Sequence, residues 1–246
     1  MNTLKERLRS GARLVGALLR LPAEDLVEMV AISGFDFVVI DCEHGPNEVA
    51  DLRRHIALAE LHQMPVIVRV GSGEPALTLR ALDQGAAGII APHIDTPAQA
   101  EALVDAVHYP PIGHRGFATY TRVGRFGTVD PVQHQARMLQ ETIVVGMIES
   151  PDGVRRASDI LAVPGLDAIM IGTADLTASS APDDPAPTAS IETVNHLLAA
   201  RGCWRMDIVG TRAAAAAAFD DGAQLVVYNL AASLMTHLTE LRSVRL

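Results

Sequence analysis

Short apolar runs and helix-like stretches alternate eight times along this chain of 246 residues. Apolar runs without regular polar positions are typical of strands that are buried on both faces of a parallel sheet. The predicted strands are residues 14–19, 37–40, 65–70, 88–91, 143–148, 168–171, 203–209 and 224–227. Eight strand–helix units in a chain of this length predict one (β/α)8 barrel domain over residues 1–246. A doubly wound sheet is the alternative, but no glycine-rich dinucleotide turn follows the first predicted strand.

Helix boundaries are marked by prolines and capping residues, as at Thr96-Pro97. The predicted helices are residues 23–33, 49–62, 75–84, 97–107, 131–140, 153–161, 191–200, 211–220 and 230–242. Two segments are long for plain connectors, and long loops in compact domains are usually functional or disordered. Residues 109–129 are expected to be structured, whereas residues 173–190 are interpreted as a mobile lid.

The overall charge and the rarity of lysine exclude several classes of function. A formal net charge of −9 argues against nucleic acid and anionic membranes as partners. Cys42 and Cys203 lack metal-type spacing, and no apolar segment is long enough to span a membrane, so a cytoplasmic protein is expected. Lys5 is the only lysine and precedes the first strand, so the predicted site contains no lysine for Schiff-base chemistry.

Charged side chains follow four of the predicted strands at the point where each strand ends. They are Asp41, Glu43 and His44 after the second strand, Arg69 at the end of the third, Glu149 after the fifth and Asp175 after the sixth. The carboxyl ends of barrel strands meet at one face, where barrel enzymes build their active sites. These side chains are therefore predicted to form a single site.

Each of these residues has both a catalytic and a structural interpretation. Glu149 and Asp175 suit an oxygen-preferring ion such as Mg²⁺ or Mn²⁺, or they form an ion-paired cluster with Arg69. His44 is either a proton-transfer group or a structural histidine. Arg69 either pairs with Asp41 or Glu149, or it binds a carboxylate or a developing oxyanion of the substrate.

The segments that carry these residues resemble a known enzyme family. They are similar to the metal-dependent, pyruvate-using class II aldolases typified by 4-hydroxy-2-oxoheptanedioate aldolase and 2-dehydro-3-deoxyglucarate aldolase, which are relatives of the citrate lyase β-subunit. The matching segments are residues 34–47, 68–69, 82–86, 109–116, 148–150 and 171–176. The resemblance implies a barrel of the phosphoenolpyruvate/pyruvate-binding type.

The resemblance also implies a role for each matching residue. Glu149 and Asp175 would hold a divalent metal (Mg²⁺, Mn²⁺ or Co²⁺) that chelates the 2-oxo acid. Arg69 would stabilise the pyruvate enolate. His44, supported by Asp83, would move the proton of the 4-hydroxyl group. The backbone amides that would take the substrate carboxylate are those of Gly172, Thr173 and Ala174.

Family members are commonly hexamers in which the last helix is exchanged between neighbours, which implies that residues 230–246 leave their own barrel. Leucines recur along this segment at the spacing of one helix face. They are Leu230, Leu234, Leu238 and Leu241. This apolar stripe fits either an exchanged helix in a homo-oligomer or packing within the chain.

Three positions depart from the family pattern. Met147 stands where the family usually has a glutamine that contacts the substrate, so Met147 is expected to line the pocket and to change the preferred substrate. Thr173 replaces a usual proline, and Leu18 replaces a tryptophan. Met147 and Leu18 predict a pocket that is larger or more apolar than usual.

The activity predicted from the resemblance is reversible cleavage of a 4-hydroxy-2-oxo acid into pyruvate, or a close analogue, and an aldehyde through a metal-bound enolate. One alternative is a Claisen-type citrate or acyl-CoA lyase or synthase that uses the same enolate. Another is a barrel that binds a 2-oxo acid or dicarboxylate without turnover because Met147 has dismantled part of the site. Retention of His44, Arg69, Glu149 and Asp175 disfavours this last interpretation.

Overall fold

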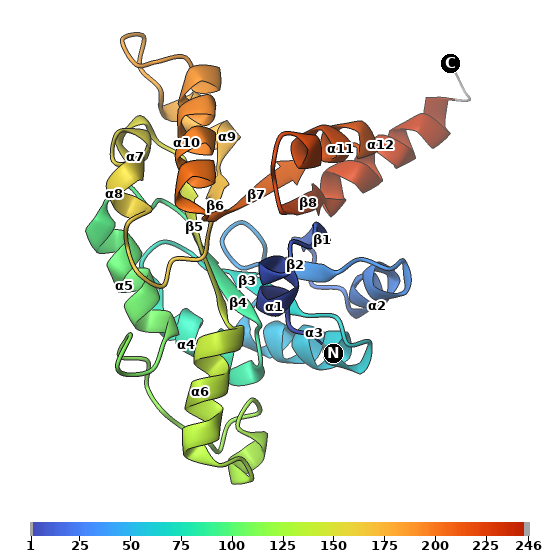
Figure 1. Ribbon diagram of the computed structural model, residues 1–246. Coiled ribbons are helices and arrows are strands. Elements are labelled where there is room, and N and C mark those ends of the chain that lie inside the picture. The colour runs from blue at the N-terminus through green and yellow to red at the C-terminus, as the bar shows by residue number, and fades with distance from the viewer. Residues whose placement is uncertain (1, 244–246) are drawn as a thin grey trace.

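The computed structural model describes residues 2–243 and shows a closed barrel of eight parallel strands (Figure 1). The strands are β1 (Leu14–Leu19), β2 (Phe37–Asp41), β3 (Val66–Arg69), β4 (Gly88–Ala91), β5 (Ile143–Ile148), β6 (Ala168–Ile171), β7 (Trp204–Val209) and β8 (Leu225–Asn229). Each strand pairs with the next along the chain, and β8 closes the barrel against β1. The predicted (β/α)8 barrel is thus confirmed, with four of the eight strands at their predicted bounds.

Helices cover the outside of this barrel. They are α1 (Leu4–Arg9), α2 (Glu24–Ile32), α3 (Val49–Leu61), α4 (Pro75–Gln84), α5 (Pro97–Val107), α6 (Pro131–Glu141), α7 (Pro151–Arg155), α8 (Ala157–Ile160), α9 (Thr173–Ser179), α10 (Pro187–Arg201), α11 (Arg212–Asp220) and α12 (Leu230–Arg242). The last predicted helix is described only to the end of α12, because residues 244–246 lie outside the described residues, as does residue 1.

Several helices differ from the sequence-based expectation, and the predicted helix at residues 153–161 is divided into α7 and α8. Residues 173–190 were interpreted as a loop that could form a mobile lid, and the structure shows that they contain α9 and the start of α10. The short helix α1 was not predicted. Its N-terminus is held by a capping box in which Thr3 and Glu6 each accept a hydrogen bond from the other's backbone N–H.

The apolar core forms two layers around the strands. Inward-facing side chains fill the barrel, and Leu4 and Leu8 of α1 close its N-terminal end. Outward-facing side chains pack against the helices in a larger second cluster, and those of β7 and β8 form a small separate cluster with α11. Since alternate residues of a strand face opposite sides, each strand contributes to both layers, and the charged residues at the strand ends are fixed by two packed faces.

The single lysine lies at the N-terminal end of the barrel, away from the carboxyl ends of the strands. Lys5 Nζ lies 2.8 Å from Asp167 Oδ2, just before β6, and donates a hydrogen bond of 2.9 Å to the carbonyl of Thr142, just before β5. Because both partners precede their strands, Lys5 and the charged residues that follow the strands lie at opposite ends of the barrel. The structure therefore agrees with the exclusion of Schiff-base chemistry.

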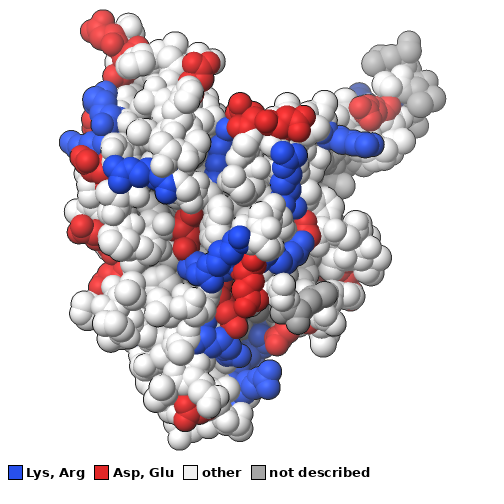
Figure 2. All heavy atoms as spheres, viewed as in Figure 1, with Lys and Arg blue, Asp and Glu red and all other residues white. Residues whose placement is uncertain are grey.

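Acidic and basic side chains are interspersed on the face shown in Figure 2. That face has no continuous basic surface of the kind that binds nucleic acid. Within residues 2–243, no helix has the length and apolar character needed to cross a bilayer.

Candidate active site

A cavity of about 780 Å³ opens at the carboxyl ends of the strands. Four of the residues predicted for the site, together with the backbone at 172–174, line this cavity. They are His44, Arg69, Met147, Asp175 and the segment Gly172, Thr173 and Ala174. Residues that are far apart in the sequence, from His44 to Asp175, thus lie together at one end of the barrel, as the strand-end pattern predicted.

Arg69 is buried and held by two carboxylates. Its Nε and Nη2 donate hydrogen bonds of 2.9 and 2.6 Å to the two oxygens of Asp41, its register partner on the neighbouring strand β2. Its Nη1 lies 3.2 Å from Glu43 Oε2. Burial alone would raise the pKa of Asp41, but the hydrogen bonds and charge of Arg69 lower it overall. The predicted pairing of Arg69 with Asp41 is present, and Nη1 faces the cavity side of this pair.

Glu149 is a buried carboxylate without an arginine or lysine partner among the described residues. Its Oε1 accepts a hydrogen bond of 2.7 Å from the backbone N–H of His93 and lies 3.2 Å from the imidazole Nδ1 of that residue. Burial raises the pKa of Glu149, and the charges of Glu43 and Asp175 raise it further, against the lowering effect of His93. This site therefore has an excess of negative charge that a cation would relieve.

The backbone beside Glu149 is shaped around its carboxylate. A Cβ at Gly172 would lie only 2.2 Å from Glu149 Oε2, so a side chain at this position would displace the carboxylate. Asp175 lies two residues into the first turn of α9 and is exposed toward the cavity. Amide groups of a first helical turn have no partner within the helix, so those of Thr173 and Ala174 are free to bind an anion.

The donor set fits a hard divalent cation. Glu149 and Asp175 offer carboxylate oxygens at adjoining strand ends, which Mg²⁺ and Mn²⁺ prefer. Within residues 2–243, no group of three or more His, Cys, Asp or Glu side chains forms a complete set of metal ligands. A cation held here would therefore retain several positions for water or substrate oxygens.

His44 and Asp83 lie in different surroundings. The His44 side chain is 56% exposed, and its Nε2 lies 3.9 Å from Glu43 Oε1. Asp83, on α4, accepts a hydrogen bond of 2.7 Å from Arg115 Nη2, and the guanidinium of Arg115 also stacks on the Tyr109 ring. Among the described residues, Asp83 forms no hydrogen bond with His44, so its support of His44 stays a prediction.

Met147 lies beside Arg69 at the bottom of the cavity. It is 2% exposed, and its Sδ is 4.0 Å from Arg69 Nη1. A thioether is a weak acceptor, so the stronger partner of this guanidinium nitrogen is the carboxylate of Glu43, 3.2 Å away.

Sequence reasoning missed two residues of the site. Arg20, directly after β1, donates a hydrogen bond of 3.0 Å from Nε to Asp41 Oδ2 and lines the cavity. His93 was assigned no role, yet its backbone and its side chain both contact Glu149. His93 also has a positive φ of 54°, which is uncommon for a residue other than glycine. The one signal in the sequence was that each follows a predicted strand.

A parallel barrel with arginine, histidine and unneutralised carboxylates at its carboxyl end defines an α/β-barrel enzyme that acts on a small anionic substrate. The model of the HpcH/HpaI aldolase/citrate lyase family matches residues 16–233. The chain belongs to this family.

Relatives with assigned names are similar over most of the chain. A pyruvate aldolase from Rhizobium etli is 35% identical over 78% of this chain and 76% of its own length. A 2-keto-3-deoxy-L-rhamnonate aldolase from Salmonella gallinarum is 38% identical over 72% of this chain and 66% of its own length. The crystal structure of a family protein from Burkholderia cenocepacia J2315 superposes with a TM-score of 0.90 at 31% identity and covers the whole of both chains.

Proposed function

We propose that this protein is a divalent-metal-dependent carbon–carbon lyase that reversibly cleaves a 4-hydroxy-2-oxo acid into pyruvate, or a close analogue, and an aldehyde. The observation that carries the proposal is the buried carboxylate of Glu149, whose pKa is raised by burial and by the nearby charge of Asp175, while Asp175 and Arg69 line the same cavity. The names of the aldolase relatives support the reaction type.

Glu149 and Asp175 would hold Mg²⁺, Mn²⁺ or Co²⁺, consistent with the metal dependence typical of this family. A bound divalent cation would supply Lewis-acid polarisation of the 2-oxo group. The protein's own contribution is to orient the Glu149 carboxylate through the hydrogen bond from the His93 N–H, in the space that Gly172 leaves open.

The remaining groups bind and move charge during the reaction. The amides of Thr173 and Ala174 take the substrate carboxylate, and Arg69 Nη1 stabilises the negative charge that develops on the 2-oxo oxygen. His44 removes the proton of the 4-hydroxyl group as the C3–C4 bond breaks, and the aldehyde leaves. The electron pair of that bond forms the enolate of pyruvate, and His44 returns the proton to C3, directly or through water.

A direct assay tests this function. Metal-free protein is incubated with a panel of 4-hydroxy-2-oxo acids, and pyruvate release is followed by reduction to lactate with a coupled dehydrogenase. We expect release only after Mg²⁺, Mn²⁺ or Co²⁺ is added, and loss of release with excess chelator. Pyruvate release that persists after exhaustive chelation would contradict the proposal.

A Claisen-type reaction is the second candidate because the family includes citrate lyases as well as aldolases. It uses the same enolate but a different electrophile. Citrate and acyl-CoA esters, assayed under the same metal conditions, separate the two reactions: cleavage of these substrates without release of pyruvate from 4-hydroxy-2-oxo acids would favour the second.

Replacement of Met147 by glutamine tests whether this position selects the 2-oxo acid. A glutamine amide next to Arg69 Nη1 adds a donor and an acceptor where the thioether has neither in useful strength. We expect a change of about tenfold in kcat/KM for pyruvate relative to longer 2-oxo acids, measured in the condensation direction. Met147→Leu keeps the apolar volume and is the matched control, for which we expect less than a threefold change.

We further propose that the protein is a cytoplasmic homo-oligomer that uses α12 as a contact surface. Figure 1 shows α12 pointing away from the barrel. None of its residues is buried in the single chain, and four large apolar side chains are exposed: Leu234, Met235, Leu238 and Leu241. Packing within the chain therefore does not cover most of the stripe. A hexamer follows from the family resemblance, and light scattering on the purified protein measures it.

A further inference from the structure

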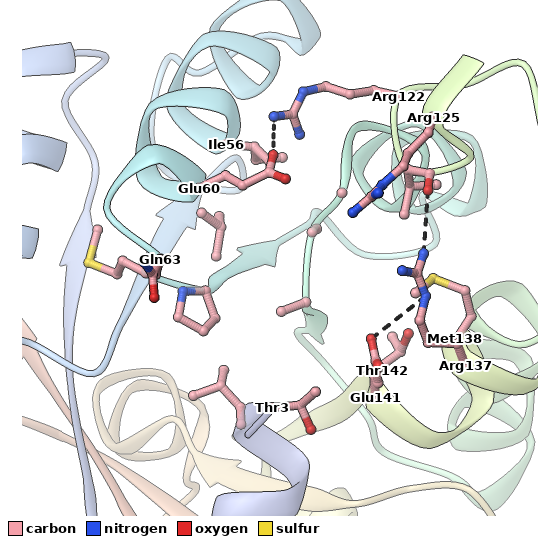
Figure 3. A pocket seen from close by; sticks show the side chains of 18 residues that line it. Thr3, Ile56, Glu60, Gln63, Arg122, Arg125, Arg137, Met138, Glu141 and Thr142 are labelled. Carbon is pink, nitrogen blue, oxygen red and sulfur yellow. Dashed lines mark hydrogen bonds and ion pairs between the residues drawn. The ribbon is translucent and has the colours of Figure 1, made fainter. Parts of the chain in front are cut away.

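A second cavity, of about 330 Å³, lies at the opposite end of the barrel from the active site. Its floor is made by residues that precede the strands, such as Pro65, Ala87 and Thr142, and its walls by α3, α6 and the loop that precedes α6 (Figure 3). The distance to the active site is at least the length of β3, which is about 13 Å for four residues. The cavity is therefore separate from the site described above.

Three arginines and two glutamates line this cavity. They are Arg122, Arg125, Arg137, Glu60 and Glu141. The excess of one positive charge stands out in a chain whose net charge is −9. Between the charged groups lie apolar side chains of Ile56, Met64 and Met138. The cavity thus combines an apolar wall with a cationic rim, as small-molecule sites often do.

Arg122 is fixed in place by the protein. Its Nη1 donates a hydrogen bond of 2.8 Å to the carbonyl of Gln84, and its Nη2 pairs with Glu60. Gly85, with φ of 106°, allows this approach, because a Cβ there would lie 3.2 Å from Arg122 Nη1. Both Nη atoms of Arg122 therefore have partners within the protein, and the side chain forms a fixed edge of the cavity.

Arg137 is under-satisfied in the same cavity. Its Nε is buried and has no hydrogen-bond partner among the described residues. The nearest carboxylate oxygen, on Glu141, lies 4.0 Å away, and Nη2 reaches the carbonyl of Val123 only at 3.5 Å. An unpaired buried donor costs free energy, so this guanidinium favours an added acceptor.

Arg125 is held toward the cavity without any carboxylate partner. Among residues 2–243 it forms no ion pair, and Figure 3 shows its guanidinium pointing into the space between Arg122 and Arg137. Arg125 and Phe126 have positive φ values of 47° and 55°, so two consecutive non-glycine residues adopt an unfavourable backbone. Such strain is found mainly at functional sites, where surrounding structure maintains it.

From these contacts we infer that the cavity is a binding site for a small molecule that carries an oxyanion group, a phosphate or a carboxylate, on a compact apolar body. The oxyanion would accept hydrogen bonds from Arg125 and from Arg137 Nε, and its charge would balance the local excess. Guanidinium groups suit both oxyanions because their donors form a planar fork.

Calorimetric titration of the full-length, metal-free protein tests the site, with inorganic phosphate and succinate as the two probes. We expect saturable binding of at least one probe, and the stronger one tells which oxyanion is preferred. Arg125→Gln and Arg137→Gln should each weaken that binding by about tenfold or more, the usual loss for a charge-assisted hydrogen bond.

Two control variants separate this site from other anion binding. Arg53→Gln removes an exposed, unpaired charge from another part of α3 and should leave probe affinity unchanged. Arg69→Lys alters the active site, so an anion bound there would respond to it and not to Arg125→Gln. Since Arg125 is exposed, its replacement is expected to fold normally. Affinities that are the same in wild type, Arg125→Gln and Arg137→Gln, or no binding by wild type up to about 10 mM, would overturn the inference.

Discussion

Replacement of Glu149 by glutamine is expected to abolish lyase activity and, at the same time, to stabilise the metal-free protein. The carboxylate is 2% exposed, its pKa is raised chiefly by burial, and it has no arginine or lysine partner among the described residues. At neutral pH its ionised form therefore costs free energy, which the neutral, isosteric amide avoids. The hydrogen bond from the His93 N–H to the side-chain oxygen can remain.

The expected result has two readouts. Activity should fall about a thousandfold or more, because the metal's Lewis-acid contribution is worth several kcal/mol. The Tm of the metal-free protein should rise by about 2–4 °C, the shift that 1 kcal/mol gives in a domain of this size. The rise in Tm that added Mn²⁺ gives in the wild type should disappear, since it depends on binding to the folded state.

Asp175→Asn and Glu101→Gln are the matched comparisons. Asp175 is exposed, so its replacement should remove activity and the metal response without stabilising the metal-free protein. Glu101 is exposed on α5 and should affect neither. If Glu149→Gln keeps both the metal-induced rise in Tm and an activity within about threefold of wild type, the carboxylate is not a metal ligand.

Most strands were predictable because they are apolar on both faces. In β5 all six residues are buried, and a continuous run of that kind has few other structures available to it. The helix α9 was not predictable in the same way. Its sequence, TADLTAS, has no apolar period, and only Leu176 is buried. That helix is fixed by its tertiary position after β6 and not by intrinsic propensity.

The membership of the site was predictable, but the partners within it were not. Strand ends converge in any parallel barrel, so His44, Arg69 and Asp175 had to lie near one another. Which charge pairs with which depends on register and loop geometry. Asp83 was expected beside His44, yet its carboxylate contacts Arg115, 32 residues later in the chain. The contact of Glu149 with His93 depends on a positive φ that a single sequence does not reveal.

The second large effect is expected for Arg69→Lys, which keeps the positive charge but loses the planar fork. Arg69 donates hydrogen bonds from Nε and Nη2 to Asp41, and its Nη1 lies next to Glu43. A lysine ammonium cannot make both Asp41 hydrogen bonds and still present a fixed donor to a developing oxyanion. We expect kcat to fall by about 10²–10³-fold, as when a preorganised oxyanion donor is removed, with kcat/KM falling in parallel.

Arg69→Lys is also expected to lower the stability of the fold, and this effect has to be separated from the fall in kcat. Arg205, on β7, is the matched control, because it is also largely buried, its Nε and Nη2 donate hydrogen bonds to both oxygens of Asp207, and its Nη1 pairs with Asp221. Its neighbour Met206 lies in the core cluster that fills the barrel, so Arg205 faces outward from the barrel and lines the cavity from that outer side. Arg205→Lys should lower Tm by a similar amount and leave kcat within about threefold. Equal losses of kcat in the two variants would mean that Arg69 acts only through the fold, as the partner of Asp41. If kcat falls only in Arg69→Lys, at a temperature well below the Tm of both variants, the Arg69 guanidinium takes part in the reaction itself.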